Sequence, residues 1–529
     1  MRNTPSHGAA ALQPTTTNDL QESVRVRDAM AIQAKAPPRP PVGEAEILHA
    51  VEPQTERPLT SLTTTPYGAT MLRPSLALLS LVLGSSPVVA QEPPDKAEFA
   101  ARRAAVAKAA VTAHPDRALV IILRGATKAA DMGAFVQDQD FLYLAGVAEP
   151  DLAMVLVPGK DGTLAHDELL VPPFSPFSAT WDGRFLAPGE ESAKRTGFAL
   201  VGNVRSISDR ITEKLAAGAD GKYPLLLTLT KAAARTGSTP NKAASAAEAR
   251  KKDKFDGRES REQAFVDVLK NQFDGLEVAS LEALVHPLRA HKSPAEIEVL
   301  RRCSAIAAAG IGEAMQSAQP GQYEYELAAA ARFVFTLRGA GPDAYAAIVG
   351  GGANGCILHY SECSKQLTGD DLIVMDYAPT LHGYATDVTR TFPAAGKFSP
   401  AQRKLVQDVY EIQQALIADV KPGARLSAIG AKCAKLLKER GYRSDHGPCH
   451  HVGLAVHDPN PDVLEAGMVI TVEPGAYLRD QGMGCRIEDT ILVTSDGCEV
   501  LSKDVPSTPD AIEALMAKMG LLERMKATK

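Results

Sequence analysis

The pattern of hydrophobic and polar residues predicts a helix first and then a series of short strands. Residues 96–113 form an alanine-rich helical stretch, and residues 232–262 form a polar surface excursion with partial helix. Around them, short runs of apolar and β-branched residues predict strands at 118–123, 141–144, 154–158, 168–171 and 225–229. Strands that alternate with helical segments are typical of an α/β domain, which we place at residues 91–285.

The next stretch opens with strong helix-start signals. Ser293 precedes a proline and is followed three residues later by a glutamate, which is the signature of a capping box. Ser399 begins the same arrangement with a glutamine, and its helix should run to about residue 420. A further helix should lie between residues 427 and 441. Apolar β runs that end in acids surround these helices, so we predict an α+β domain with an antiparallel or mixed sheet at 286–506 and a helical tail at 507–529.

The first 90 residues divide into two regions of different character. Residues 1–70 are rich in proline, threonine, alanine and glutamine, without a sustained apolar period, which is typical of disorder. From Met71 onward, one arginine, an apolar core at 76–83 and small residues before Gln91 form a signal-peptide pattern with cleavage after Ala90. A buried strand or helix of the first domain is the alternative interpretation of this apolar run.

Targeting machinery reads a signal peptide near the N-terminus, so we expect translation to start at Met71 and residues 1–70 to be misassigned. The protein would then be exported, either periplasmic or secreted; with a start at Met1 we expect a cytoplasmic protein. The apolar segment is too short for a comfortable membrane span, so none is expected after cleavage.

Composition sets the size and excludes some classes of protein. A chain of 529 residues exceeds one ordinary core, so two domains with appendages are expected. The net charge of −6, without a basic stripe that carries aromatic residues, gives no case for nucleic-acid binding. All seven cysteines follow residue 302 and none forms a CxxC pair, so they indicate small buried side chains and neither a disulfide framework nor a zinc knuckle.

Four acids stand where the pattern predicts buried strands. Asp376, Glu473 and Glu488 lie directly against apolar residues, and Asp387 lies in a predicted strand at 384–390. A carboxylate buried at a strand end costs several kcal/mol unless a partner neutralises it. One such acid is readily explained by a salt bridge or an exposed strand end. Four of them, together with a histidine cluster, favour a cation site.

The histidine cluster lies at residues 446–458. His446 and His450 are four residues apart, as in a helical zinc motif, but Gly447 and Pro448 argue against a helix and the motif's glutamate is missing. Only some of these histidines should therefore bind metal. Carboxylate-rich ligation with one imidazole suits manganese better than a thiolate zinc site would. Four carboxylates balance two divalent ions and leave room for one bridging hydroxide, so we expect two ions, Mn²⁺ first and Co²⁺ or Zn²⁺ as alternatives.

Taken in order, these segments resemble the M24 metallopeptidases, most closely the Xaa-Pro aminopeptidase (aminopeptidase P) group. The resemblance covers roughly residues 285–500, and segments at 135–146 and 181–184 resemble the domain that precedes this fold in aminopeptidase P and prolidase. It implies a pita-bread catalytic domain behind a creatinase-like α/β domain. Two departures, Ala378 in place of a common glycine and Cys485 before the last ligand segment, remove no ligand.

The resemblance also implies roles for the five candidate ligands. Asp376 would bind one metal, and His450 and Glu473 would bind the other. Asp387 and Glu488 would bridge both ions. The hydroxide between the metals would attack the scissile carbonyl, with Glu473 as the group that accepts and donates the proton.

The remaining candidates surround this set. His359 and His457 resemble the family's histidines that bind substrate and stabilise the tetrahedral intermediate. His446 is a weaker candidate at the edge of the site, with a structural or solvent-facing imidazole as the alternative, and His451 should only pack or face solvent. Arg486 should share a strand face with Glu488 and pair with an acid.

The function implied is an exopeptidase that hydrolyses the bond between an N-terminal residue and a following proline, and the proline preference rests on the resemblance alone. Peptides with proline second would be its partners, and we expect a homo-oligomer. A dipeptide-specific prolidase is the alternative within the same chemistry. A non-catalytic pita-bread binding protein and a metal-free amidinohydrolase similar to creatinase are further alternatives, but both should lack the acids that are present here.

Overall fold

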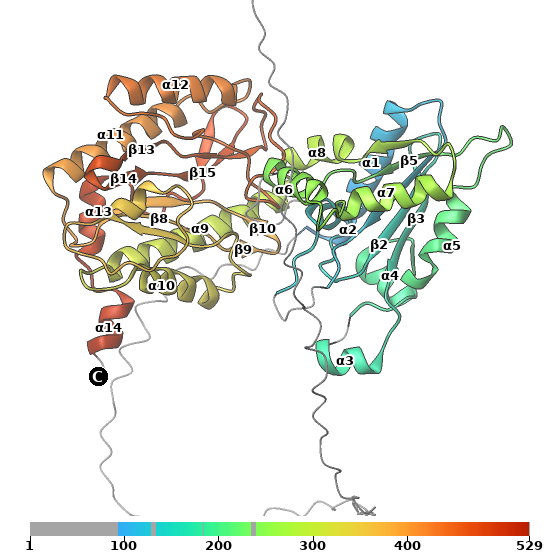
Figure 1. Cartoon of the computed structure of the whole chain (residues 1–529), viewed down its shortest axis with the longest axis horizontal. Coiled ribbons are helices and arrows are strands. Elements are labelled where there is room, and N and C mark those ends of the chain that lie inside the picture. The colour runs from blue at the N-terminus through green and yellow to red at the C-terminus, as the bar shows by residue number, and fades with distance from the viewer. Residues whose placement is uncertain (1–93, 129–133, 184, 234–239, 528–529) are drawn as a thin grey trace, which may run out of the picture. The chain divides into compact units, whose positions relative to one another are not determined.

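The structure, a computed structural model, describes residues 94–128, 134–183, 185–233 and 240–527. The predicted extension at 1–70 and the predicted signal peptide at 71–90 lie outside the described residues. An α/β region is followed by an α+β region, so the predicted fold class is confirmed (Figure 1). Within the described part of the chain, no helix is long and apolar enough to cross a membrane.

The first region contains one six-stranded sheet in the order β4-β3-β2-β1-β5-β6. Its central strand β1 pairs antiparallel with β2 and parallel with β5, so the sheet is mixed. The strands are β1 (Leu119–Arg124), β2 (Ala153–Pro158), β3 (Leu164–Val171), β4 (Leu200–Asn203), β5 (Leu225–Thr228) and β6 (Val278–Ser280).

Helices cover both faces of this sheet. Ile121 and Leu123 pack into the same core as the helices α1 (Lys96–Ala113) and α2 (Gln139–Ala145). Val120 and Ile122, which point to the other face, pack with α5 (Ile207–Lys214) and α7 (Arg261–Gln272). A strand covered on both faces has no solvated side, which is why β1 is an unbroken apolar run.

The strand predicted at 141–144 is wrong, because these residues belong to α2. Asp138 caps the helix by accepting a hydrogen bond from the Phe141 N–H, and Gly146 ends it in the left-handed conformation. A short apolar run does not distinguish a buried strand from a buried helix by period alone, and here the caps decide. The other helices of this region are α3 (Pro176–Asp182), α4 (Glu190–Thr196), α6 (Pro240–Lys252) and α8 (Glu282–Ala290).

The strands of the second region pair antiparallel throughout the described residues. One sheet has the order β11-β8-β7 and another β12-β15-β16, and two hairpins, β9–β10 and β13–β14, accompany them. The strands are β7 (Ile348–Gly351), β8 (Leu372–Asp376), β9 (Thr380–Leu381), β10 (Tyr384–Ala385), β11 (Thr389–Pro393), β12 (Val469–Val472), β13 (Gly475–Leu478), β14 (Met483–Arg486), β15 (Asp489–Val493) and β16 (Cys498–Val500).

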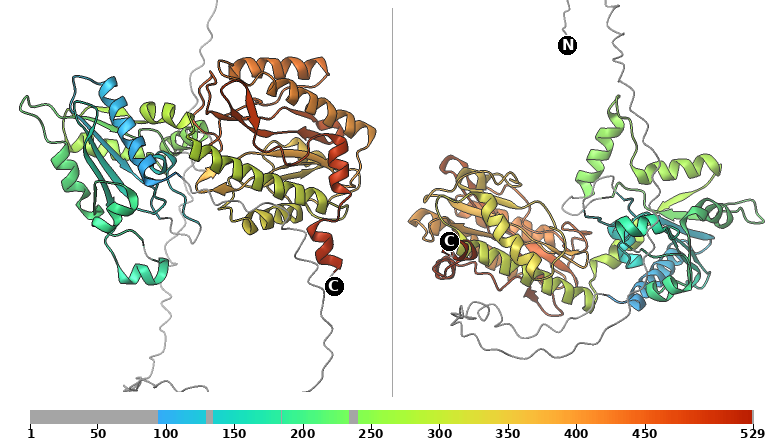
Figure 2. Two further views of the ribbon diagram at one scale, coloured as in Figure 1. Left: turned by 180° about the vertical axis from the view of Figure 1, so that it is seen from behind. Right: turned by 90° about the horizontal axis from the view of Figure 1, so that it is seen from below.

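Pairs of helices lie along the two faces of these strands. Figures 1 and 2 show α9 (Pro294–Ser317) and α10 (Glu324–Leu337) on one side and α11 (Pro400–Ile417) and α12 (Leu426–Glu439) on the other. The capping boxes predicted at Ser293 and Ser399 are both formed and begin α9 and α11. The chain then continues through α13 (Pro509–Met516) and α14 (Leu521–Ala527).

Candidate metal centre

The five predicted ligands stand where strands of the second region end or break. Asp376 is the last residue of β8, and Glu473 follows directly after β12. His450 precedes β12 in a segment whose next residue pairs with Ile470 of that strand. Strand ends present side chains at a sheet edge, which allows residues from distant parts of the sequence to meet there.

Asp387 and Glu488 lie in breaks of predicted strands. The strand predicted at 384–390 is divided into β10 and β11, and Asp387 lies between them. Glu488 likewise lies between β14 and β15. At this point the Glu488 N–H donates to the Thr389 carbonyl at 3.1 Å, so the two breaks are joined. Two acids are thereby placed opposite each other on neighbouring chain segments.

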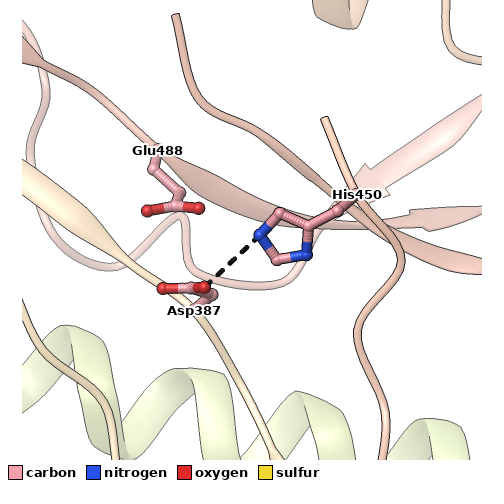
Figure 3. Close-up of side chains that lie close together, drawn as sticks. All are labelled: Asp387, His450 and Glu488. Atoms are coloured by element: carbon pink, nitrogen blue, oxygen red, sulfur yellow. Dashed lines mark ion pairs between the residues drawn. The ribbon is translucent and has the colours of Figure 1, made fainter. Parts of the chain in front are cut away.

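The ligand atoms converge around the His450 imidazole. Its Nε2 lies 3.6 Å from Asp387 Oδ2 and 3.4 Å from Glu473 Oε1. Asp387, His450 and Glu488 each offer a ligand atom, and these atoms lie within 4.8 Å of one another. Figure 3 shows the two carboxylates beside the imidazole, facing a common space. This spacing is suited to a shared cation.

Asp376 joins the group through two hydrogen-bond donors. The Tyr345 hydroxyl lies 2.5 Å from Asp376 Oδ1 and 2.6 Å from Asp387 Oδ1 and shares its single proton between the two carboxylates. The Arg486 guanidinium donates to Asp376 Oδ2 at 2.7 Å, which confirms that this arginine pairs with an acid. The structure therefore brings all five predicted ligands into one buried cluster.

The acids of the cluster disturb one another's protonation. Burial and the neighbouring Asp387 raise the pKa of Asp376 to about 6. Burial, against a smaller opposing effect of His450, raises the pKa of Glu473 to about 7. Burial and three acidic neighbours place the pKa of Glu488 well above its usual range. These raised pKa values indicate that the cluster holds more carboxylates than the positive side chains beside them can neutralise.

His450 offsets part of that excess. Burial by itself would lower its pKa, but the hydrogen bond with Asp387 and the charge of Glu473 raise the pKa of His450 to about 9. Burial would raise the pKa of Asp387, but the His450 contact outweighs it and the pKa lies below the usual value.

Glu488 provides the test of whether the cluster fits a metal. One carboxylate oxygen accepts from the Thr389 hydroxyl at 2.6 Å, while the other, Oε1, is buried without a protein partner. Its neighbour Asp489, which points elsewhere, accepts from Arg390, Ser502 and Gln413. A carboxylate oxygen without a partner, with three further acids beside it, provides the oxygen ligands that divalent cations prefer. The residues of the cluster therefore fit a divalent metal ion.

The predicted substrate histidines adjoin this cluster. The His457 ring stacks on His450 with centroids 4.1 Å apart and planes at 29°. His359 is more exposed, and its Nδ1 lies 3.4 Å from the Lys242 ammonium of α6. Burial, Lys242 and Arg486 hold the pKa of His359 below its usual value. Both imidazoles are near the cluster without belonging to the set of close ligand atoms.

The other two histidines have different environments. His446 contacts the Tyr477 hydroxyl at 3.0 Å, and its Nδ1 lies 3.6 Å from Glu473 Oε2, so it belongs to the edge of the site. His451 is fully buried, and its Nε2 lies 3.1 Å from the Pro461 carbonyl oxygen, so it is a packing residue.

Sequence reasoning missed Tyr345, Thr389 and Tyr477. Tyr345 stands between two alanines in a loop before β7 and belongs to no regular period, so nothing in the sequence marks it as a neighbour of Asp376. Tyr477 lies between His446 and Arg486, with 3.0 Å to each. The alternation of β13 places its side chain, but only the pairing with β14 shows what that side chain meets.

Comparisons with known proteins identify the family of this chain. The model of metallopeptidase family M24 matches residues 298–495, and that of the aminopeptidase P N-terminal domain matches residues 99–222. The chain is 31% identical over 443 residues to the Xaa-Pro aminopeptidase of Escherichia coli strain K12, which covers 75% of this chain and 93% of that protein. It is 30% identical over 248 residues to the Xaa-Pro dipeptidase of Pyrococcus furiosus, which covers 45% of this chain and 71% of that protein.

Solved structures match over 80% of this chain. Escherichia coli aminopeptidase P with the inhibitor Pro-Leu matches with a TM-score of 0.65 and 28% identity, over 80% of this chain and 99% of that chain. A zinc-substituted form of the same enzyme, in complex with product, also matches with a TM-score of 0.65.

Proposed function

The chain belongs to metallopeptidase family M24, with the N-terminal domain of aminopeptidase P, and we propose that it is an Xaa-Pro aminopeptidase. In this proposal it hydrolyses the bond between an N-terminal residue and a following proline. The observation that supports it most is the buried acid cluster around His450, with an unpartnered Glu488 oxygen. The aminopeptidase match extends over far more of the chain than the dipeptidase match, which favours longer peptides as substrates.

The cluster has the ligands for two divalent ions. Asp376 would hold one ion, His450 and Glu473 the other, and Asp387 and Glu488 would contact both. The oxygen-rich set favours Mn²⁺, with Co²⁺ or Zn²⁺ as alternatives. When bound, such ions lower the pKa of a water molecule and polarise the scissile carbonyl.

The chain's own groups would prepare the reaction. The Tyr345 hydroxyl contacts one oxygen each of Asp376 and Asp387, which leaves Asp387 Oδ2 on the side of His450. Arg486 fixes the Asp376 carboxylate from the opposite side. Glu473, which lies 3.4 Å from His450 Nε2, would accept a proton from the nucleophile and donate it to the leaving nitrogen. His457 and His359 would bind the substrate and stabilise the charge that develops on the carbonyl oxygen.

Metal analysis followed by peptide cleavage tests this function. The purified protein should contain about two divalent ions per chain and release the N-terminal residue from Xaa-Pro-Yaa tripeptides but not from Xaa-Ala-Yaa controls. Removal of metal by a chelator should stop the release, and Mn²⁺ should restore it. Cleavage of Xaa-Pro dipeptides alone would indicate a prolidase, and absence of any cleavage by the metal-loaded protein would contradict the proposal.

Export is a separate part of the proposal, supported by the signal-peptide pattern that ends at Ala90. N-terminal sequencing of the natural protein should find a mature start at Gln91. A protein that begins at Met1 in its native host would rule out both the start at Met71 and the export. The homo-oligomer stays a prediction, which sedimentation of the purified protein tests.

A further inference from the structure

A second cluster of buried charge lies next to the candidate metal centre. It consists of Asp140 on α2, Arg289 on α8, and Lys292 and Asp458 of the second region, and we call it the Arg289 network. Their side chains are 11%, 5%, 1% and 2% exposed, respectively. Charges this deeply buried remain ionised only when they are paired.

Each carboxylate of the Arg289 network is paired. One guanidinium nitrogen of Arg289 donates to Asp140 Oδ1 at 2.6 Å and another to Asp458 Oδ1 at 2.5 Å. The Lys292 ammonium donates to Asp458 Oδ2 at 3.2 Å. These contacts keep the pKa of Asp458 below its usual range in spite of burial. Arg289 thus connects an acid of the first region to an acid of the second.

Asp458 anchors the loop that carries the candidate substrate histidine. Its Oδ1 accepts from the Ala455 N–H at 3.2 Å, and its own N–H donates to the His451 carbonyl at 3.0 Å. A side chain at Gly453 would approach Asp458 Oδ2 to 2.4 Å, so the loop closes tightly on this carboxylate. The Gly453 carbonyl also accepts from the Ala385 N–H at 2.7 Å, close to the candidate ligand Asp387.

Among the described residues, no side chain or backbone group forms a hydrogen bond that orients the ring of His457, the residue before Asp458. Its Nδ1 is buried without a protein partner, whereas imidazoles in metal sites are usually oriented by a bond at the second nitrogen. The ring is held by stacking on His450 and by the backbone that carries it. Its orientation therefore depends on how firmly residues 451–458 are fixed, and their ionic anchor is Asp458.

We propose that Asp140 and Arg289 are positioning residues for the hydrolysis, which hold Asp458 and through it the loop that aims His457 at the substrate. The inference rests on the proposed function only where it predicts an effect on hydrolysis. The anchoring of the loop by Asp140 and Arg289 does not depend on that function. An acid of the first region, on a helix that contains no candidate ligand, thereby controls the geometry of the catalytic site. No step of the chemistry passes through Arg289 itself.

A double-mutant comparison with His457 tests this route. Arg289→Met should lower kcat/KM of the metal-loaded enzyme about 30- to 100-fold, the range expected when a catalytic group is displaced by about 1 Å. In a His457→Ala background the same substitution should cost less than about threefold, because the group that Arg289 positions is gone. Equal losses in the two backgrounds would overturn the proposal, since a loss of general stability does not depend on His457.

Arg103→Met is the matched control. Arg103 is a fully buried arginine that pairs with Asp167, at 2.8 Å, and donates to the Leu144 carbonyl of α2, but no hydrogen bond or ion pair among the described residues joins it to Asp140, Arg289 or Asp458. It should destabilise the fold comparably and leave kcat/KM within about threefold of wild type. Asp140→Asn, which keeps the shape of the side chain and removes its charge, provides a second variant if Arg289→Met does not fold.

Hydrogen exchange separates the proposal from the proposed function, because it requires no substrate. Amides of residues 452–458 should exchange at least about tenfold faster in Asp140→Asn and Arg289→Met than in wild type, and should be unchanged in Arg103→Met. Unchanged exchange in this loop would overturn the positioning role. Faster exchange in a protein that cleaves no Xaa-Pro peptide would reject the peptidase and retain the structural link.

Discussion

The acid cluster around His450 and the Arg289 network are both buried groups of charges, but they are neutralised in different ways. In the Arg289 network, Asp140 and Asp458 face Arg289 and Lys292, and both carboxylates have lowered pKa values. In the acid cluster, the pKa values of Asp376, Glu473 and Glu488 are raised instead. The comparison teaches that burial of acids does not by itself indicate a metal. Buried acids that outnumber the positive side chains beside them do.

Removal of a bridging carboxylate should have the largest effect. Asp387→Ala and Glu488→Ala should each lower kcat/KM at least about 10³-fold, which corresponds to about 4 kcal/mol of transition-state stabilisation. Both variants should keep the circular dichroism spectrum of the folded protein and lose bound metal. Asp489→Asn, one residue along the chain, is the control: it should destabilise the fold and retain the metal content, because Asp489 is paired with Arg390. Full activity in the double variant would contradict the two-metal site.

Stability of the metal-free protein should change in opposite directions in the two clusters. Asp458→Asn leaves Arg289 and Lys292 short of a counter-charge, so the free energy of unfolding should fall by about 3 kcal/mol. Glu488→Gln removes a carboxylate whose pKa burial raises, so at pH 7 it should raise the free energy of unfolding of the metal-free protein.

Denaturant unfolding in the presence of a chelator measures both values. With metal present, Glu488→Gln should instead lower the free energy of unfolding. Metal that binds only the folded state then stabilises the wild type more than the variant. If Asp458→Asn and Glu488→Gln lowered the free energy of unfolding of the metal-free protein by similar amounts, the two clusters would not differ in how their charges are neutralised.

A smaller effect is expected at the rim of the site, where Lys242 faces His359. Burial remains the main cause of the lowered pKa of His359, and Lys242 adds to it. Lys242→Met should therefore let this pKa rise and, with neutral His359 as the active form, move the acidic limb of kcat/KM to higher pH. Lys251→Met, an exposed position on the same helix, should leave the limb in place. A shift toward lower pH would contradict the assignment.

Several features of this molecule could be predicted because their causes are local. The capping boxes at Ser293 and Ser399 need only four consecutive residues, and the helices α9 and α11 begin there as predicted. Asp376 and Glu473 could be found because an acid directly after an apolar run is costly without a partner. Residues 141–144 were assigned incorrectly because an apolar run of four fits a buried helix as well as a strand.

The amino-acid sequence by itself determined the two fold classes, the helix starts at Ser293 and Ser399, and the identity of the acids and histidines that cannot be buried alone. Tertiary structure alone decided which of them meet: Tyr345 with Asp376 and Asp387, His457 on His450, and Arg289 between two distant acids. The physical reason is the range of the forces involved. Caps and periodicity act within one or two turns, whereas the charge balance of a buried carboxylate depends on side chains that only the folded chain brings within a few ångströms.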